Sequence, residues 1–132
     1  MIRSLARAAF ALWLGFLPAM AIAADPAFVA GIDELPLMPG LDELEESAVD
    51  FETPEGRIVV AFATGDLATD AVGAFYAATL PAFGWRQDGP TLFRREGEDL
   101  TLEFPKDERP PGARGVVVKF SLRPTKSAAP SR

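Results

Sequence analysis

The sequence predicts an α+β fold with two layers, in which one helix packs on one face of an antiparallel sheet of about four to five strands. Three observations indicate this class. Several short segments alternate apolar and polar residues, as strands with one buried face do. A single segment, residues 68–80, repeats its apolar residues at helical spacing. Short turns that contain glycine separate neighbouring strand segments, which favours antiparallel pairing.

Two strands are expected before the helix. Residues 57–62 are rich in β-branched and aromatic side chains, and Ile58, Val60 and Phe62 fall on one face of the strand. Residues 48–52 can pair with this strand across the turn at residues 53–56.

The helix is expected to start after Asp66, whose carboxylate can accept hydrogen bonds from the first-turn amides. It should end or distort at Leu80, because Pro81 disfavours helical geometry in the residue before it. Gly84 is free to adopt a positive φ and turn the chain into Trp85.

Three strands are expected after the helix, at residues 91–95, 100–104 and 116–123, with a weak strand at 85–87. The predicted order is therefore β-β-α-β-β-β. If Phe93, Phe104 and Phe120 face the core, alternation places four charged residues on or near the face away from the helix: Arg94, Glu103, Lys119 and Arg123.

Several packing and turn residues carry a resemblance: Phe75-Tyr76, Leu80-Pro81, Gly84-Trp85, the run from Phe93 to Glu98, and Leu100. The pattern resembles a type of small secreted protein or lipoprotein of Gram-negative bacteria. The resemblance covers about residues 50–124 and implies a fold and a compartment. It implies no catalytic or binding residue.

The N-terminus has the features of a secretory signal peptide. Arg3 and Arg7 precede an apolar run over residues 8–24, and Ala21 and Ala23 supply the small residues that a signal peptidase requires. We therefore expect residues 1–23 to be removed after Ala23, which gives a periplasmic or secreted protein with no membrane span. A retained anchor is the alternative, although 17 apolar residues fall just short of a usual span.

Composition excludes several classes of function. The chain contains no His and no Cys, which removes thiol nucleophiles, histidine bases, haem ligation and the common zinc sites. No glycine-rich phosphate loop is present, so we expect no cofactor and no metal. The formal net charge of −6 argues against a nucleic-acid partner, because phosphate binding requires a basic surface.

The chain divides into four predicted parts: the signal peptide at 1–23, an acidic arm at 24–47, the α+β domain at 48–124 and a polar tail at 125–132. Residues 25–55 hold ten acidic residues and no basic one. Pro36 and Pro39 prevent regular structure in the arm, and five apolar side chains there are candidates for contacting a partner: Leu35, Leu37, Met38, Leu41 and Leu44. The alternative is that these side chains dock on their own domain.

Carboxylates are the catalytic groups that composition leaves, and a pair of them in a cleft could hydrolyse glycosides. Pairs such as Glu45-Glu46 and Glu98-Asp99 lie in polar or turn-like stretches, which is typical of a solvated surface. The acidic residues at 42–46 lack the alternating-oxygen spacing of a calcium loop. Phe75 and Trp85 are expected in the core instead of in an aromatic box.

The sequence therefore predicts an exported, non-catalytic domain that interacts with another envelope protein or associates with the envelope. A module for a small apolar or lipid ligand is the alternative, and a carboxylate-dependent hydrolase is a lower one.

Overall fold

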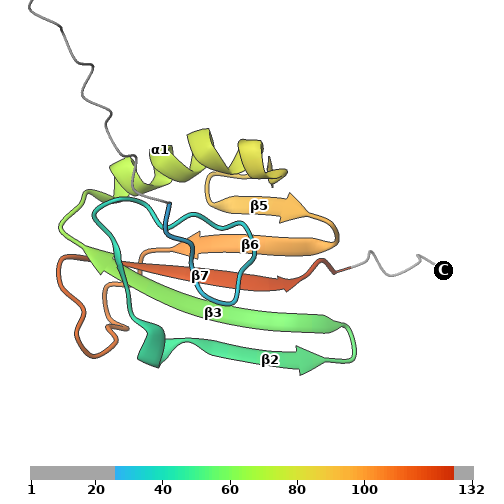
Figure 1. Ribbon diagram of the computed structural model, residues 1–132, viewed down its shortest axis with the longest axis horizontal. Helices are drawn as coiled ribbons and strands as arrows, with labels where there is room; N and C mark the ends of the chain where they lie inside the picture. The colour runs from blue at the N-terminus through green and yellow to red at the C-terminus, as the bar shows by residue number, and fades with distance from the viewer. Residues whose placement is uncertain (1–25, 127–132) are drawn as a thin grey trace, which may run out of the picture.

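A computed structural model describes residues 26–126 (Figure 1). These residues form one antiparallel sheet of seven strands and one α-helix, α1 (Thr69–Thr79), with two short 3-10 turns. The strands are β1 (Asp42–Glu43), β2 (Val49–Thr53), β3 (Gly56–Gly65), β4 (Arg86–Gln87), β5 (Leu92–Arg95), β6 (Glu98–Glu103) and β7 (Val116–Pro124). The α+β class and the antiparallel sheet are thus confirmed.

The prediction of four to five strands in the order β-β-α-β-β-β is wrong in its details. β1 adds a strand before the predicted first one, and the weak segment after the helix does pair, as β4. The spatial order is β1-β3-β7-β6-β5-β4, and β2 also pairs with β3. Both β1 and β2 lie on the side of β3 opposite β7, because β7 already pairs with the same stretch of β3.

One face of the sheet is the core face, and its alternate residues are all at most 3% exposed. They are Val59, Ala61 and Ala63 of β3, Val118, Phe120 and Leu122 of β7, Leu100 and Leu102 of β6, and Phe93 of β5. Ile58, Val60 and Phe62 share one face of β3, as expected, and that face is opposite the core face of the sheet.

The expected register is confirmed: Arg123 is exposed, Lys119 is only half-buried, and Phe93 and Phe120 are in the core. The second face is partly covered at one end, where the β6–β7 connection returns over it. There the Thr64 Oγ1 hydroxyl bonds to the Arg114 backbone, donating to its carbonyl and accepting from its amide.

α1 packs on the core face through Val72 and Tyr76, and the 3-10 turn at Leu80–Phe83 continues from it. The residue before the helix is Ala68, so the predicted cap at Asp66 is wrong. α1 ends at Thr79 and continues as the 3-10 turn from Leu80, the residue at which an end or a distortion was expected, and Gly84 takes a φ of 84° and reverses the chain.

The N-terminal segment, residues 26–41, completes the layer beside α1. In Figure 1 it crosses the sheet over β6, β7 and β3. Four of its side chains are at most 5% exposed and belong to the same hydrophobic cluster as α1 and the sheet: Val29, Ile32, Leu35 and Leu41. The predicted boundary between an arm at 24–47 and a domain at 48–124 therefore crosses one continuous core.

The expected signal peptide, its cleavage after Ala23 and most of the polar tail lie outside the described residues. Within residues 26–126, no helix has the length and apolar character needed to cross a bilayer.

Candidate binding groove

The N-terminal segment folds back on itself before it reaches the sheet. The Val29 amide donates to the Leu35 carbonyl over 2.9 Å, and the Leu37 amide donates to the Ala27 carbonyl over 2.7 Å. Pro36 forms an isolated bridge with Phe28 and has no amide hydrogen to extend a ladder, so the segment remains a short irregular loop.

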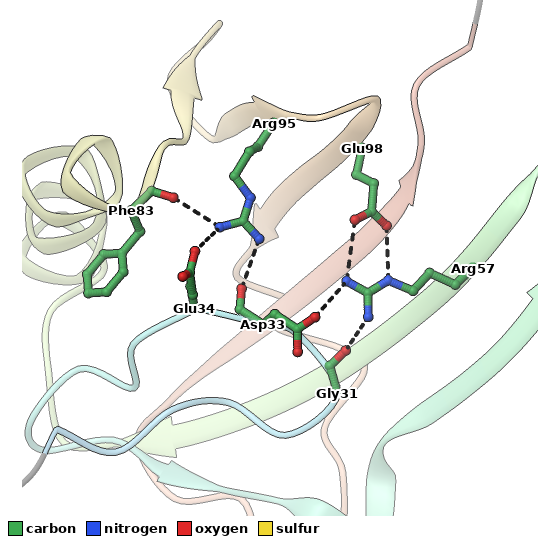
Figure 2. Close-up of polar contacts among 7 residues, drawn as sticks. All are labelled: Gly31, Asp33, Glu34, Arg57, Phe83, Arg95 and Glu98. Atoms are coloured by element: carbon green, nitrogen blue, oxygen red, sulfur yellow. Dashed lines mark hydrogen bonds and ion pairs between the residues drawn. The ribbon is translucent and has the colours of Figure 1, made fainter.

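Two arginines on the core side of the sheet hold the tip of this loop (Figure 2). Arg57 of β3 makes two hydrogen bonds to the Glu98 carboxylate, of 3.1 and 3.3 Å, and one to the Gly31 carbonyl, of 3.2 Å. The bond to Glu98 is the main reason that the pKa of Arg57 is raised, so its charge is permanent.

Arg95 of β5 holds the next residues of the same loop (Figure 2). It donates to the Glu34 carboxylate at 2.9 Å, the Asp33 carbonyl at 3.1 Å and the Phe83 carbonyl at 3.0 Å. Its guanidinium carbon lies 4.3 Å from the centre of the Trp85 ring. The acidic segment thus docks on basic residues of its own domain, which was one of the two predicted alternatives.

Tyr76 joins the loop to α1. Its side chain is fully buried, its hydroxyl donates to the Pro36 carbonyl at 2.9 Å, and the Met38 amide donates to the hydroxyl at 3.2 Å. Burial raises the pKa of this phenol well above its usual value of 10.0.

The result is an apolar groove of about 420 Å³ between residues 26–41 and the C-terminal half of α1. Its walls contain one hydroxyl-bearing side chain and no charged one. The lining residues are Pro26, Ala27, Pro36, Leu37, Met38, Pro39, Leu41, Phe75, Thr79 and Phe83. Phe28 extends one wall, since it is 45% exposed and meets Phe83 edge-on at 6.0 Å.

The structure separates the five predicted contact residues. Leu35 and Leu41 are both buried in the core. A partner cannot reach Leu35, which is fully buried, and it can touch only the part of Leu41 that lines the groove. Leu37 and Met38 are half-buried and line the groove, whereas Leu44 lies elsewhere, against Gly112 of the β6–β7 connection. Leu35 is therefore too deeply buried to contact a partner, whereas for the half-buried Leu44, away from the groove, such a contact stays a prediction.

Sequence reasoning missed the opposite wall of the groove. Phe75 was expected in the core but is only partly buried, because it lies at the rim of the helix stripe, one residue before the buried Tyr76. Trp85, in contrast, is 2% exposed, as expected. The aromatic residue Phe83, close to the end of the helix, was a feature of the sequence that could have predicted this wall.

The acidic pairs considered for hydrolysis have other roles. Glu98 binds Arg57, and Asp99 accepts a hydrogen bond from Arg94 at 3.2 Å. Among residues 26–126, no cluster of three or more potential ligands is placed to hold a metal ion. Burial raises the pKa of Glu43, whose carboxylate accepts from the Ala30 amide at 2.9 Å.

Replacing Tyr76 with Phe is expected to destabilise the fold by about 1–3 kcal/mol, because the Pro36 carbonyl and the Met38 amide lose a buried partner. The native protein should also lose stability above pH ~10, since the unfolded phenol ionises there and the buried one, with its raised pKa, does not. Urea denaturation between pH 8 and 11 measures both effects. Y76F should show a smaller alkaline loss, and an equal loss in both proteins would contradict the assignment.

Comparison of the chain with protein-family models, with curated proteins and with solved structures gives no match, so functional inference rests on the surfaces of the molecule itself.

Proposed function

We propose that this protein is an exported, non-catalytic binding domain of the cell envelope, and that its groove takes apolar side chains of another envelope protein. Export follows from the expected signal peptide at residues 1–23, with release into the periplasm or the medium after Ala23.

The observation that carries this proposal is the composition of the groove. Leu37, Met38, Phe75 and Phe83 leave apolar surface exposed in one concave place, and Phe28 adds an exposed ring at its margin. Aromatic residues and methionine are enriched in protein interfaces, and a concave apolar patch takes an apolar side chain readily.

The same groove supports an apolar ligand as a second candidate. Its volume of about 420 Å³ lies within the range of small-molecule sites. Three of the lining residues are prolines, which have no amide hydrogen to offer, and Thr79 supplies the one side-chain hydroxyl. A hydrocarbon chain needs no polar partner, so this wall suits the acyl chain of a lipid.

Photocrosslinking in the envelope distinguishes the two. A photoreactive apolar residue is placed at Leu37 of the full chain, and a matched control carries it at Asp107, an exposed position in the β6–β7 connection that does not line the groove. We expect one discrete protein adduct from position 37 that is absent from position 107. A lipid adduct from position 37 would select the second candidate, and no adduct from either class would reject the groove as a binding site.

Substitution of Met38 by Asp in the same crosslinking chain supplies a second measurement. A charge in the apolar groove should reduce the adduct at least tenfold, because the carboxylate stays solvated and excludes apolar side chains. The variant's thermal unfolding is measured in parallel. An undiminished adduct in a folded M38D protein would show that the crosslink forms outside the groove.

A further inference from the structure

We infer that the outer edge of β2 accepts an extended, basic segment of another protein as an added strand. This surface is separate from the groove, since β2 forms the opposite margin of the sheet from β5 and α1 (Figure 1).

β2 offers backbone hydrogen-bonding groups that no strand among residues 26–126 uses. Within residues 26–126 it pairs with β3 alone, over the five residues Val49–Thr53. In an antiparallel pair, alternate residues direct their amide and carbonyl groups away from the partner strand. An edge of this kind is a template for a further strand unless the protein covers it.

The side chains on one face of this edge are apolar and exposed. Val49 and Phe51 are each 48% exposed, although both are large hydrophobic residues. They lie directly across from Val60 and Ile58 of β3, which are half-buried. The four make one apolar patch on the face away from α1, continuous with the free edge.

The charge around β2 selects the kind of partner. Seven acidic residues and no basic one fall between positions 42 and 56. None of the seven forms an ion pair with another of residues 26–126, in contrast to Asp33, Glu34 and Glu98 elsewhere. They are Asp42, Glu43, Glu45, Glu46, Asp50, Glu52 and Glu55.

These charges also disfavour a second copy of the chain at the same edge. Asp50 and Glu52 alternate with the apolar residues of β2 and are exposed on its other face. Pairing two β2 strands edge to edge would bring four carboxylates together, and like charges on neighbouring strands repel. A strand that carries Lys or Arg opposite Asp50 and Glu52 would meet attraction in the same geometry.

A segment that fits the outer edge of β2 therefore alternates apolar and basic side chains with a period of two. One face presents β-branched or aromatic side chains to the patch of Val49 and Phe51, and the other presents basic side chains to Asp50 and Glu52. Arg123 and Lys126 lie beside Ile58, on the side of β3 that faces β7. Their positive charges repel a basic segment there, so the segment is confined to the outer edge of β2.

The test is binding of labelled nine-residue peptides to the full mature chain, followed by fluorescence anisotropy. The probe peptide alternates Lys and Val, one control replaces every Lys by Glu, and a second control scrambles the probe so that the alternation is lost. We expect both controls to bind at least tenfold more weakly, and the affinity of the probe to fall as salt rises. Equal binding of the scrambled peptide would overturn the proposal, because it would show attraction to charge alone.

Two further readouts locate the strand. One probe peptide carries N-methyl groups on its odd-numbered amides, and a second carries them on its even-numbered amides. Only one of these sets of amides faces β2, so one peptide should lose binding and the other should retain it. D50K/E52K should lose probe binding at least tenfold, whereas E103K, on β6, should retain it. Three results would each overturn the proposal: equal loss of binding in both methylated peptides, unchanged binding of the probe to D50K/E52K, or dimers of the free chain in sedimentation.

Discussion

A chain that begins at Ala48 is expected to lose cooperative folding. It lacks Val29, Ile32, Leu35 and Leu41, which are at most 5% exposed and belong to the central hydrophobic cluster. Burial of each such side chain stabilises by about 1.5–3 kcal/mol, so the four together supply on the order of 6–12 kcal/mol. That is comparable with the whole stability of a small domain, about 5–15 kcal/mol.

Circular dichroism of this shortened chain during heating measures the effect, with the expected mature chain, which begins at Ala24, as the reference. The shortened chain should show no sigmoidal melt. Leu35→Ala in the longer chain is the matched single change, and it should cost about 2–5 kcal/mol because the side chain is fully buried. A cooperative melt of the shortened chain would mean that the sheet and α1 are stable without residues 26–41.

Replacing Trp85 with Ala is expected to cost about 3–5 kcal/mol, as is usual for a large buried aromatic residue. Trp85 is 2% exposed and begins the return from α1 to the sheet. Its ring also supports the guanidinium of Arg95, which holds Glu34 and the Asp33 carbonyl. The substitution should therefore loosen the N-terminal loop in addition to opening a cavity.

Trp85→Phe separates packing from polarity. Among residues 26–126, nothing accepts a hydrogen bond from the buried Trp85 Nε1, so the smaller ring removes volume and also an unpartnered donor. We expect W85F to lose well under half of what W85A loses in chemical denaturation. Equal losses in the two variants would show that the contact with Arg95 depends on the indole and that volume contributes little.

The long strands and the helix could be predicted from the sequence because their signals are local. Alternation in β6 and β7 assigns each residue to a face, and a sheet with one buried face tolerates one register. β3 is recognisable as a strand from its β-branched and aromatic residues, but it is apolar on both faces, so its sequence does not show which face is the core face. The helix has a stop signal at Pro81 and Gly84 that acts within a few residues. For the same reason the outward position of Lys119 and Arg123 followed from alternation alone.

β1 and the N-terminal loop could not be predicted in this way. β1 has two residues, too few for any alternation, and it exists because it pairs with Ala63 and Thr64 of β3. The loop has prolines and no regular hydrogen bonding, so its own sequence does not determine where it lies. Partners distant in the chain place it, as the 61-residue separation between Glu34 of the loop and Arg95 of β5 illustrates.

Some features of the candidate groove could likewise be predicted from the sequence, and others could not. The apolar character of Leu37 and Met38 is a property of the sequence, and it marked both as contact residues without showing what they face. Whether an apolar residue near them is buried, as Leu35 is, or lines a surface depends on which side of the loop meets the sheet. That side is set by Tyr76, Arg57 and Arg95, whose hydrogen bonds to the loop require β3, β5 and α1 to lie together in the folded chain.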